Sequence, residues 1–355
     1  MLLSGIFPPI TTPFYPEGNV YHKKLEANVE RYSRTPSAGI VVLGSTGEAI
    51  LLSDEERRDV LQTAIGAAAP NKVMIAGTGI ESAYETLRLT EYAAGLGYDA
   101  AMVRTPHYYK KQMLPANILA FYRTVADRSA LPIVIYNFPQ ATGYDIPAEV
   151  VIELAGHPNI VAIKESSGNL EKVTKMVEGT RQVKRSATVT ETFEAVTPRM
   201  LKAAAADNAN GGQLVSVESL GGAAKPSSSS VTVVGKMKTR QKEVGFQVMV
   251  GAAHQLEPSL ARGAVGAILA FACPAPMACY EIYAALKEGD TALAQEKQER
   301  VKLAAQRVVG DLGVPGVKYS MEINGYYGGP SRLPFLPLNA EQKAEIEEMM
   351  AGIKS

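Results

Sequence analysis

Lys164 directly follows a run of apolar residues in the stretch "IVAIKESSG" (160–168). An ammonium group is costly to remove from water, so a lysine is an unusual residue at the end of a buried strand. Partial burial favours the neutral amine, which can add to a ketone and form an imine. The alternative is a structural ion pair between Lys164 and a nearby carboxylate, such as that of Glu165 or Glu48.

Two hydroxyl-bearing elements could assist this amine. Tyr136 lies near the end of the apolar run "PIVIYN" (132–137), and a phenol can pass protons between neighbouring groups, as imine formation requires. Ser45 and Thr46 occupy the glycine-flanked turn "GSTGE", where hydroxyl and backbone N–H groups can hold a carboxylate. Each element also has a structural explanation, namely an interior tyrosine with a satisfied hydroxyl and an ordinary tight turn.

The segments that carry these residues alternate with longer amphipathic stretches. Each segment is short, apolar on both faces and bounded by Gly, Pro or polar residues, which is typical of strands in a parallel sheet covered on both sides. The stretch 53–69 opens with Ser53 and Glu56 in the spacing of a capping box and predicts a helix. The alternation predicts an α/β fold, a (β/α)8 TIM barrel. The expected strands are 5–11, 39–44, 72–77, 99–104, 132–137, 160–165, 246–251 and 266–271.

An open, doubly wound sheet is the alternative fold, but the first expected strand is not followed by Gly-x-Gly-x-x-Gly. We expect the barrel to occupy residues 1–275 and a C-terminal helical region to occupy 276–355. The segment 181–245 is rich in Gly, Ser and Ala and indicates a linker or flexible insertion. Because it joins a helix to the next strand, it should lie on the face opposite the carboxyl ends of the strands, where it could impair pairing of strand seven.

Composition limits the classes of function. The chain has 355 residues with 36 basic and 36 acidic side chains, so net charge gives no sign of a nucleic-acid or membrane partner. Cys273 and Cys279 form no CxxC pair and indicate neither a disulfide framework nor a zinc site. The amino terminus lacks the features of a signal peptide, and no apolar run reaches the roughly 18 residues of a membrane span. We therefore expect a soluble, cytoplasmic protein.

The ordered motifs resemble the family of dihydrodipicolinate synthase and N-acetylneuraminate lyase, the pyruvate-dependent class I aldolases. The resemblance covers almost the whole chain except about 181–245. The matching pieces are "FPPITTPF", "GSTGE", "TPHYY", "YNFPQATG", "AIKESSG", "GAVGAILAF", "PGVKYSMEINGYYGG" and "RLPFLPL".

The resemblance implies a role for each matching residue. Lys164 corresponds to the Schiff-base lysine, and Tyr136 to the tyrosine that shuttles protons. Ser45 and Thr46 correspond to the pair that binds the pyruvate carboxylate. Tyr109, chosen over Tyr108 because the family residue is the later of the two, would reach a neighbouring subunit's site. Three further positions correspond to residues that contact substrate or line the pocket floor: Ser166, Gly251 and Ile268.

One position distinguishes the branches of this family. Dihydrodipicolinate synthases typically read Tyr-Asn-x-Pro-x-Arg-Thr-Gly, whereas this chain has Ala141 in place of the arginine that binds the second substrate's carboxylate. The sequence is closer to the 4-hydroxy-2-oxoglutarate aldolase branch. We therefore expect reversible cleavage of a 2-oxo-4-hydroxy acid to pyruvate and an aldehyde, with glyoxylate as the aldehyde for 4-hydroxy-2-oxoglutarate.

Other outcomes remain open from the sequence. A 2-keto-3-deoxy sugar acid or sialic acid aldolase, a dehydratase, a dihydrodipicolinate synthase and a non-catalytic member that binds keto acids are the alternatives. The imine is itself the electron sink, so no metal or organic cofactor is expected. The expected partner is a small keto acid, pyruvate, and the resemblance implies a homotetramer built as a dimer of dimers.

Overall fold

The computed structural model describes residues 1–192, 194–206, 232–234 and 237–353. Its main sheet has eight parallel strands in the order β1-β11-β10-β6-β5-β4-β3-β2. Backbone hydrogen bonds between the segment after β1 and the segment of β2, such as Ile10 N to Val41 O at 3.0 Å, complete the circle. The strands are β1 (Gly5–Phe7), β2 (Gly39–Val42), β3 (Val73–Gly77), β4 (Ala100–Arg104), β5 (Ile133–Asn137), β6 (Ile160–Glu165), β10 (Gln247–Val250) and β11 (Gly266–Ile268). The predicted α/β barrel and its eight strands are confirmed.

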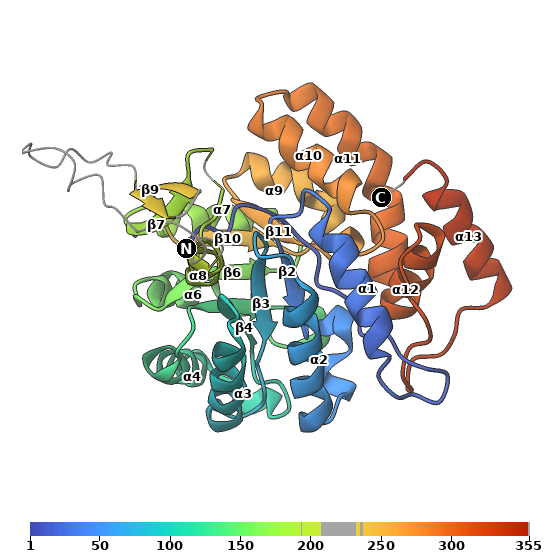
Figure 1. Cartoon of the computed structure of the whole chain (residues 1–355), viewed down its shortest axis with the longest axis horizontal. Helices are drawn as coiled ribbons and strands as arrows, with labels where there is room; N and C mark the ends of the chain where they lie inside the picture. The colour runs from blue at the N-terminus through green and yellow to red at the C-terminus, as the bar shows by residue number, and fades with distance from the viewer. Residues whose placement is uncertain (193, 207–231, 235–236, 354–355) are drawn as a thin grey trace, which may run out of the picture.

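Helices surround this barrel on the outside (Figure 1). The Ser53 hydroxyl accepts a hydrogen bond from Glu56 N at 3.1 Å, and Ser53 N donates to the Glu56 carboxylate at 2.9 Å. This capping box fixes the start of α2, as the sequence predicted. The helices around the barrel are α1 (His22–Ser33), α2 (Asp54–Ala67), α3 (Ala83–Leu96), α4 (Pro115–Arg128), α6 (Ala148–Ala155), α7 (Leu170–Gly179) and α9 (Leu256–Ala261), with the single turn α5 (Pro139–Thr142) after β5.

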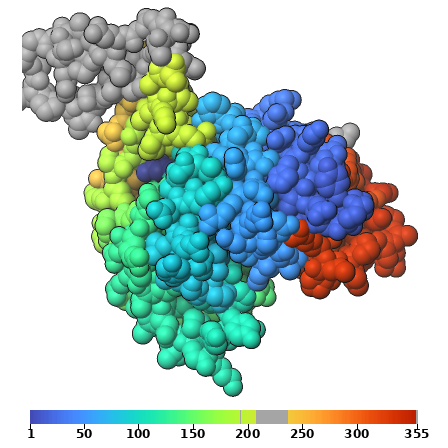
Figure 2. Space-filling view, turned by 60° about the horizontal axis from the view of Figure 1, so that its bottom comes forward, coloured from blue at the N-terminus to red at the C-terminus, as the bar shows by residue number. Residues whose placement is uncertain are grey.

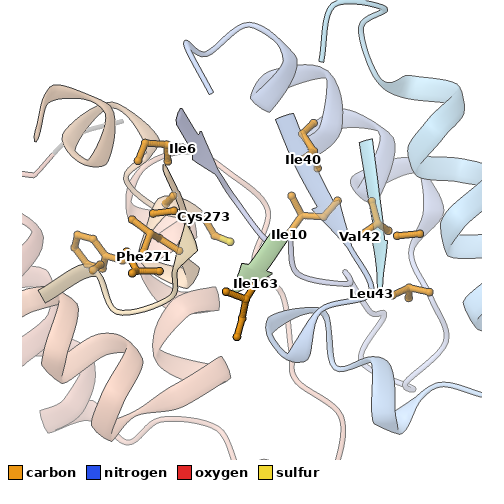
Figure 3. Close-up of a cluster of buried hydrophobic side chains, with 14 of the residues drawn as sticks. Ile6, Ile10, Ile40, Val42, Leu43, Ile163, Phe271 and Cys273 are labelled. Atoms are coloured by element: carbon orange, nitrogen blue, oxygen red, sulfur yellow. The ribbon is translucent and has the colours of Figure 1, made fainter. Parts of the chain in front are cut away.

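Alternate residues of each strand face opposite sides of the sheet and form two buried layers. Ile40, Val42 and Ile163 belong to the outer layer, between strands and helices (Figure 3). Val41 and Ala162 belong to the layer that fills the barrel interior. Since Ile163 faces outward, the next residue of β6 must face the interior.

Four helices follow the barrel: α10 (Pro276–Lys287), α11 (Thr291–Ala305), α12 (Gly313–Ile323) and α13 (Ala340–Met350). These helices form the helical appendage expected after the barrel, although Gly313, Pro315 and Gly316 make α12 hard to recognise from its sequence pattern. A π-helical segment, Gln306–Asp311, joins α11 to α12. None of the helices in the described ranges combines the length and apolar character needed to span a membrane.

The described parts of 181–245 add a small antiparallel sheet in the order β7-β9-β8, together with one helix. Ala187 and Val189 of this sheet pack with Leu2 near the amino ends of the barrel strands, so the insertion lies opposite their carboxyl ends. The expectation of a linker was therefore wrong for these parts, while the Ser227–Ser230 run lies outside the described residues. Strand β10 still pairs with both β6 and β11. The added elements are β7 (Arg185–Thr190), α8 (Pro198–Ala206), β8 (Thr232–Val234) and β9 (Met237–Val244).

Candidate active site

Lys164 is the fifth residue of β6 and points into the barrel near the carboxyl ends of the strands. Its side chain is buried, with 4% of the residue exposed. Tyr136 is its direct neighbour in the register of β5 and β6, and the Lys164 Nζ lies 4.1 Å from the centre of the Tyr136 ring. The strand alternation therefore produces the close approach of amine and phenol.

Both carboxylates that could have paired with Lys164 are bound elsewhere. Glu165 faces the opposite side of β6, where its carboxylate lies 3.0 Å from the Lys172 Nζ. The Glu48 carboxylate lies 2.6 Å from the Nζ of Lys318. Within the described ranges, no carboxylate lies at ion-pair distance from Lys164. The structural ion pair considered from the sequence is therefore not formed.

The Tyr136 hydroxyl has a hydroxyl neighbour from a distant strand. Ser45 Oγ lies 3.2 Å from the Tyr136 phenolic oxygen, and either oxygen can donate the hydrogen bond. Ser45 is the first residue of a one-turn 3-10 helix, Ser45–Gly47, that follows β2, and Thr46 beside it is buried. This arrangement gives protons a route between the phenol and the turn that could hold a carboxylate.

Gly251 and Ser166 meet on the other side of the lysine. A Cβ added at Gly251 would lie 2.0 Å from Ser166 Oγ and 3.3 Å from Lys164 Cε, so the backbone there can approach only as glycine. The Ser166 Oγ is buried and, among the residues that the structure describes, has no hydrogen-bond partner. It is thus free to bind a polar group in the cavity.

These residues line one cavity of about 470 Å³. Of the eight residues expected in the site, six line it: Ser45, Thr46, Tyr136, Lys164, Ser166 and Gly251. Ile268 is fully buried in β11 and is not part of the wall, and Tyr109 is 63% exposed on the surface.

The wall also contains basic side chains that the sequence reasoning missed. Arg104 is the last residue of β4, and its position at a strand end is a signal that could have found it. Its guanidinium donates to Glu81 at 2.9 Å. Arg57 and His254 line the same cavity, but they lie on helical turns that no strand-end rule identifies. Ala141, in the place of the family arginine, also lines the cavity.

The two imidazoles of this wall add little positive charge near neutral pH. Burial lowers the pKa of His107 below its usual value, and the nearby Arg104 lowers it further. Burial likewise lowers the pKa of His254, with a smaller effect from Lys302. Both rings therefore favour the neutral form at pH 7, and Arg57 and Arg104 supply positive charge to the wall.

Comparisons with known proteins agree with this arrangement. The family model described as "Dihydrodipicolinate synthetase family" matches residues 2–208 and 209–353. A protein of Methanothrix thermoacetophila named 4-hydroxy-tetrahydrodipicolinate synthase is 29% identical over 349 residues, covering 98% of this chain and 96% of that protein. One of the same name from Xanthomonas campestris is 40% identical over 177 residues, covering 50% of this chain and 58% of its own length. The crystal structure of dihydrodipicolinate synthase from Aquifex aeolicus is similar with a TM-score of 0.75 at 25% identity, covering 99% of this chain and 98% of that chain.

Proposed function

The chain belongs to the dihydrodipicolinate synthetase family, a family of class I pyruvate-dependent enzymes, and we propose that Lys164 forms the imine with pyruvate. The observation that carries this proposal is a buried amine in the cavity wall, without a carboxylate partner in the described ranges and 4.1 Å from the ring of Tyr136. A lysine that is not committed to an ion pair can lose its proton and act as a nucleophile.

In the proposed reaction, Ser45 and Thr46 hold the carboxylate of the keto acid and so fix its C2 carbon against Lys164. The neutral amine attacks C2, and Tyr136 passes protons as the carbinolamine loses water. The protonated imine accepts the electron pair of the bond that breaks at C3 and becomes an enamine. This bond is C3–H when the substrate is pyruvate and C3–C4 when the substrate is a 2-oxo-4-hydroxy acid. That enamine can take up a proton, or its C3 can attack an aldehyde carbon to form a new carbon–carbon bond.

The names of the relatives support condensation as the reaction of this chain. Proteins named 4-hydroxy-tetrahydrodipicolinate synthase match nearly the whole chain. The family resemblance implies that the enamine then attacks aspartate semialdehyde. The family resemblance assigns the aldehyde's carboxylate to an arginine, and here Ala141 stands at that position in the cavity wall.

Ala141 favours a second candidate, the aldol cleavage of a 2-oxo-4-hydroxy acid such as 4-hydroxy-2-oxoglutarate. In this reaction Tyr136, or a water that it orients, removes the proton of the C4 hydroxyl while the C3–C4 bond breaks. Alanine cannot donate to a carboxylate, so a substrate that does not need that arginine suits the pocket better.

Capture by borohydride tests the imine itself. Wild-type protein reduced in the presence of pyruvate should carry the added mass on the peptide that contains Lys164, and Lys164→Ala should not be captured. Lys111→Ala, a change at an exposed lysine on a surface turn, is the control and should be captured like the wild type. Capture that persists in Lys164→Ala would show that another amine forms the imine.

A pair of assays separates the two reactions. Pyruvate release is measured with 4-hydroxy-2-oxoglutarate, 2-keto-3-deoxygluconate and N-acetylneuraminate, and pyruvate consumption is measured with aspartate semialdehyde. Restoring the arginine, Ala141→Arg, should raise condensation with aspartate semialdehyde if the wild type is a poor synthase. Efficient condensation by the unaltered protein would reject the cleavage reaction as its main activity.

We also propose that the protein is a cytoplasmic homotetramer and that Tyr109 completes the site of a neighbouring subunit. Tyr109 and Tyr108 are both exposed and contact each other edge to face. Their rings therefore present apolar surface that a neighbouring subunit could cover. Sedimentation of an active monomer would contradict the role of Tyr109.

A further inference from the structure

The turn that carries Ser45 and Thr46 is strained at both of its ends. Leu43 has φ of 62° and Glu48 has φ of 55°, so two residues with side chains adopt the left-handed region. Such conformations persist only where the surrounding structure enforces them. The position of the Ser45 and Thr46 hydroxyls in the cavity therefore depends on the contacts that keep Leu43 and Glu48 in this conformation.

Glu48 is held by the C-terminal region of the chain. The residue is 1% exposed, and its Oε1 lies 2.6 Å from the Nζ of Lys318 on α12. Its Oε2 accepts a hydrogen bond of 2.8 Å from the backbone N–H of Arg332. One carboxylate thus joins the end of the turn to two separate C-terminal segments.

Lys318 extends these contacts to the segment that follows β1. Its Nζ donates to Thr12 O at 2.9 Å and to Pro330 O at 2.8 Å. The Thr12 hydroxyl in turn donates to Gly47 O, inside the turn, at 2.6 Å. The amino- and carboxyl-terminal parts of the chain also meet at α1, where Arg31 donates to Asn324 O, at the end of α12, at 2.9 Å. In Figure 2 the blue amino-terminal region adjoins the red C-terminal region.

The backbone of the C-terminal loop lies directly against this lysine. A Cβ added at Gly328 would lie 1.9 Å from Lys318 O, so only glycine allows the approach. The loop therefore packs closely against the backbone of α12 at Lys318, which limits how far this part of the helix can move away from Glu48.

We propose that Lys318 and Glu48 are positioning residues for the keto-acid site, and that they hold Ser45 and Thr46 in the strained turn from which these reach the substrate carboxylate. The inference rests on the proposed function, because it assigns the turn to substrate binding. Neither residue reacts. A fully buried ion pair can often be replaced by neutral residues at little cost in stability. The role of this pair is therefore to select one conformation of the turn that carries Ser45 and Thr46.

The decisive variant is the double substitution Glu48→Gln/Lys318→Met, which removes both charges and leaves neither buried alone. We expect it to fold and to need about tenfold more pyruvate for half-maximal borohydride capture, the usual scale for a lost charge-assisted contact. The maximal capture rate should change much less than the half-saturating concentration, because Lys164 and Tyr136 are untouched.

The matched control is Arg307→Met, which breaks an ion pair within the C-terminal region that does not touch the turn. Arg307 Nε donates to the Glu345 carboxylate at 2.7 Å. This variant should lower the melting temperature while leaving the half-saturating pyruvate concentration unchanged. A purely stabilising role for Lys318 and Glu48 predicts the same behaviour in the double variant, and that result would overturn the proposal.

A second readout separates this proposal from the proposed function. Hydrogen exchange of residues 43–48 should be faster in the double variant than in wild type and in Arg307→Met. If the wild type is never captured with pyruvate, the proposed function fails, while unchanged exchange in the double variant would reject the positioning role itself. Should the double variant not fold, Glu48→Gln alone decides by the same two measurements, because it keeps the side-chain size and leaves Lys318 its hydrogen bonds to Thr12 O and Pro330 O.

Discussion

The hydroxyl oxygens of Ser45 and Tyr136 lie 3.2 Å apart, although Ser45 follows β2, Tyr136 lies on β5, and two other strands separate β2 from β5 in the sheet. The contact crosses the mouth of the barrel and joins the turn after β2 to the strand beside Lys164. It connects the residues proposed to bind the carboxylate with those proposed to move protons. Changes on either side of this contact should therefore affect different steps.

Tyr136→Phe should slow turnover by about 10²- to 10⁴-fold, the range seen when a positioned acid–base group is lost. The ring and its packing remain, so pyruvate should still bind. Steady-state turnover and the pyruvate dependence of borohydride capture measure the two effects separately. Turnover at the wild-type rate would remove Tyr136 from the proton route.

Ser45→Ala should raise the half-saturating pyruvate concentration by roughly 10- to 150-fold, which corresponds to the loss of about 1.5–3 kcal/mol for one hydrogen bond to a charged group. Turnover should also fall, but less than in Tyr136→Phe, because the phenol loses a partner and not its own proton. Ser53→Ala provides a control of the same chemistry at the start of α2, away from the cavity. A pyruvate dependence unchanged in Ser45→Ala would show that the carboxylate binds elsewhere.

Gly251→Ala should reduce both stability and capture, because the new Cβ would lie 2.0 Å from the Ser166 oxygen. Forcing an extra methyl group into a packed site costs about 1–3 kcal/mol. Adding Ser166→Gly should recover part of the stability, since the change removes the atoms that clash. Gly66→Ala in α2, where no atom lies within 4 Å of the added carbon, should instead be neutral or stabilise by about 0.5–1 kcal/mol. Thermal unfolding of the four proteins gives the comparison.

Glu56 should make stability depend on pH in the acidic range. Its hydrogen bonds from Arg332 lower the pKa of the carboxyl below the usual 4.5. The folded state thus favours the carboxylate, and this contribution is present above pH 4.5 and is lost as the pH falls through the lowered pKa. The melting-temperature difference between wild type and Glu56→Gln should narrow from pH 6 to pH 3. Glu55→Gln, at an exposed neighbouring position, should show no such trend.

The sequence predicted the barrel well because each strand is a local pattern of apolar residues between Gly, Pro and polar residues. The same pattern put Lys164 and Tyr136 at the carboxyl ends of their strands, and the structure brings both into one cavity. The family resemblance, now confirmed, then gave them roles that remain to be tested.

Other features could not be predicted because they depend on contacts between distant parts of the chain. Lys318 reads as an ordinary polar residue of a short helix, and nothing near it in the sequence reveals that Glu48, far earlier in the chain, is its partner. The insertion was judged by its Gly- and Ser-rich composition, which concealed strands β7 and β9. Their pairing, such as Thr188 with Gln241, joins residues far apart in the chain and leaves no local signal.

The small sheet of β7, β8 and β9 is attached at the amino ends of the barrel strands, whereas the cavity opens at their carboxyl ends. The packed interior of the eight-stranded barrel separates the small sheet from the cavity. The length and sequence of the small sheet can therefore diverge during evolution, and the sheet can acquire a separate role, while the residues around the cavity keep their positions.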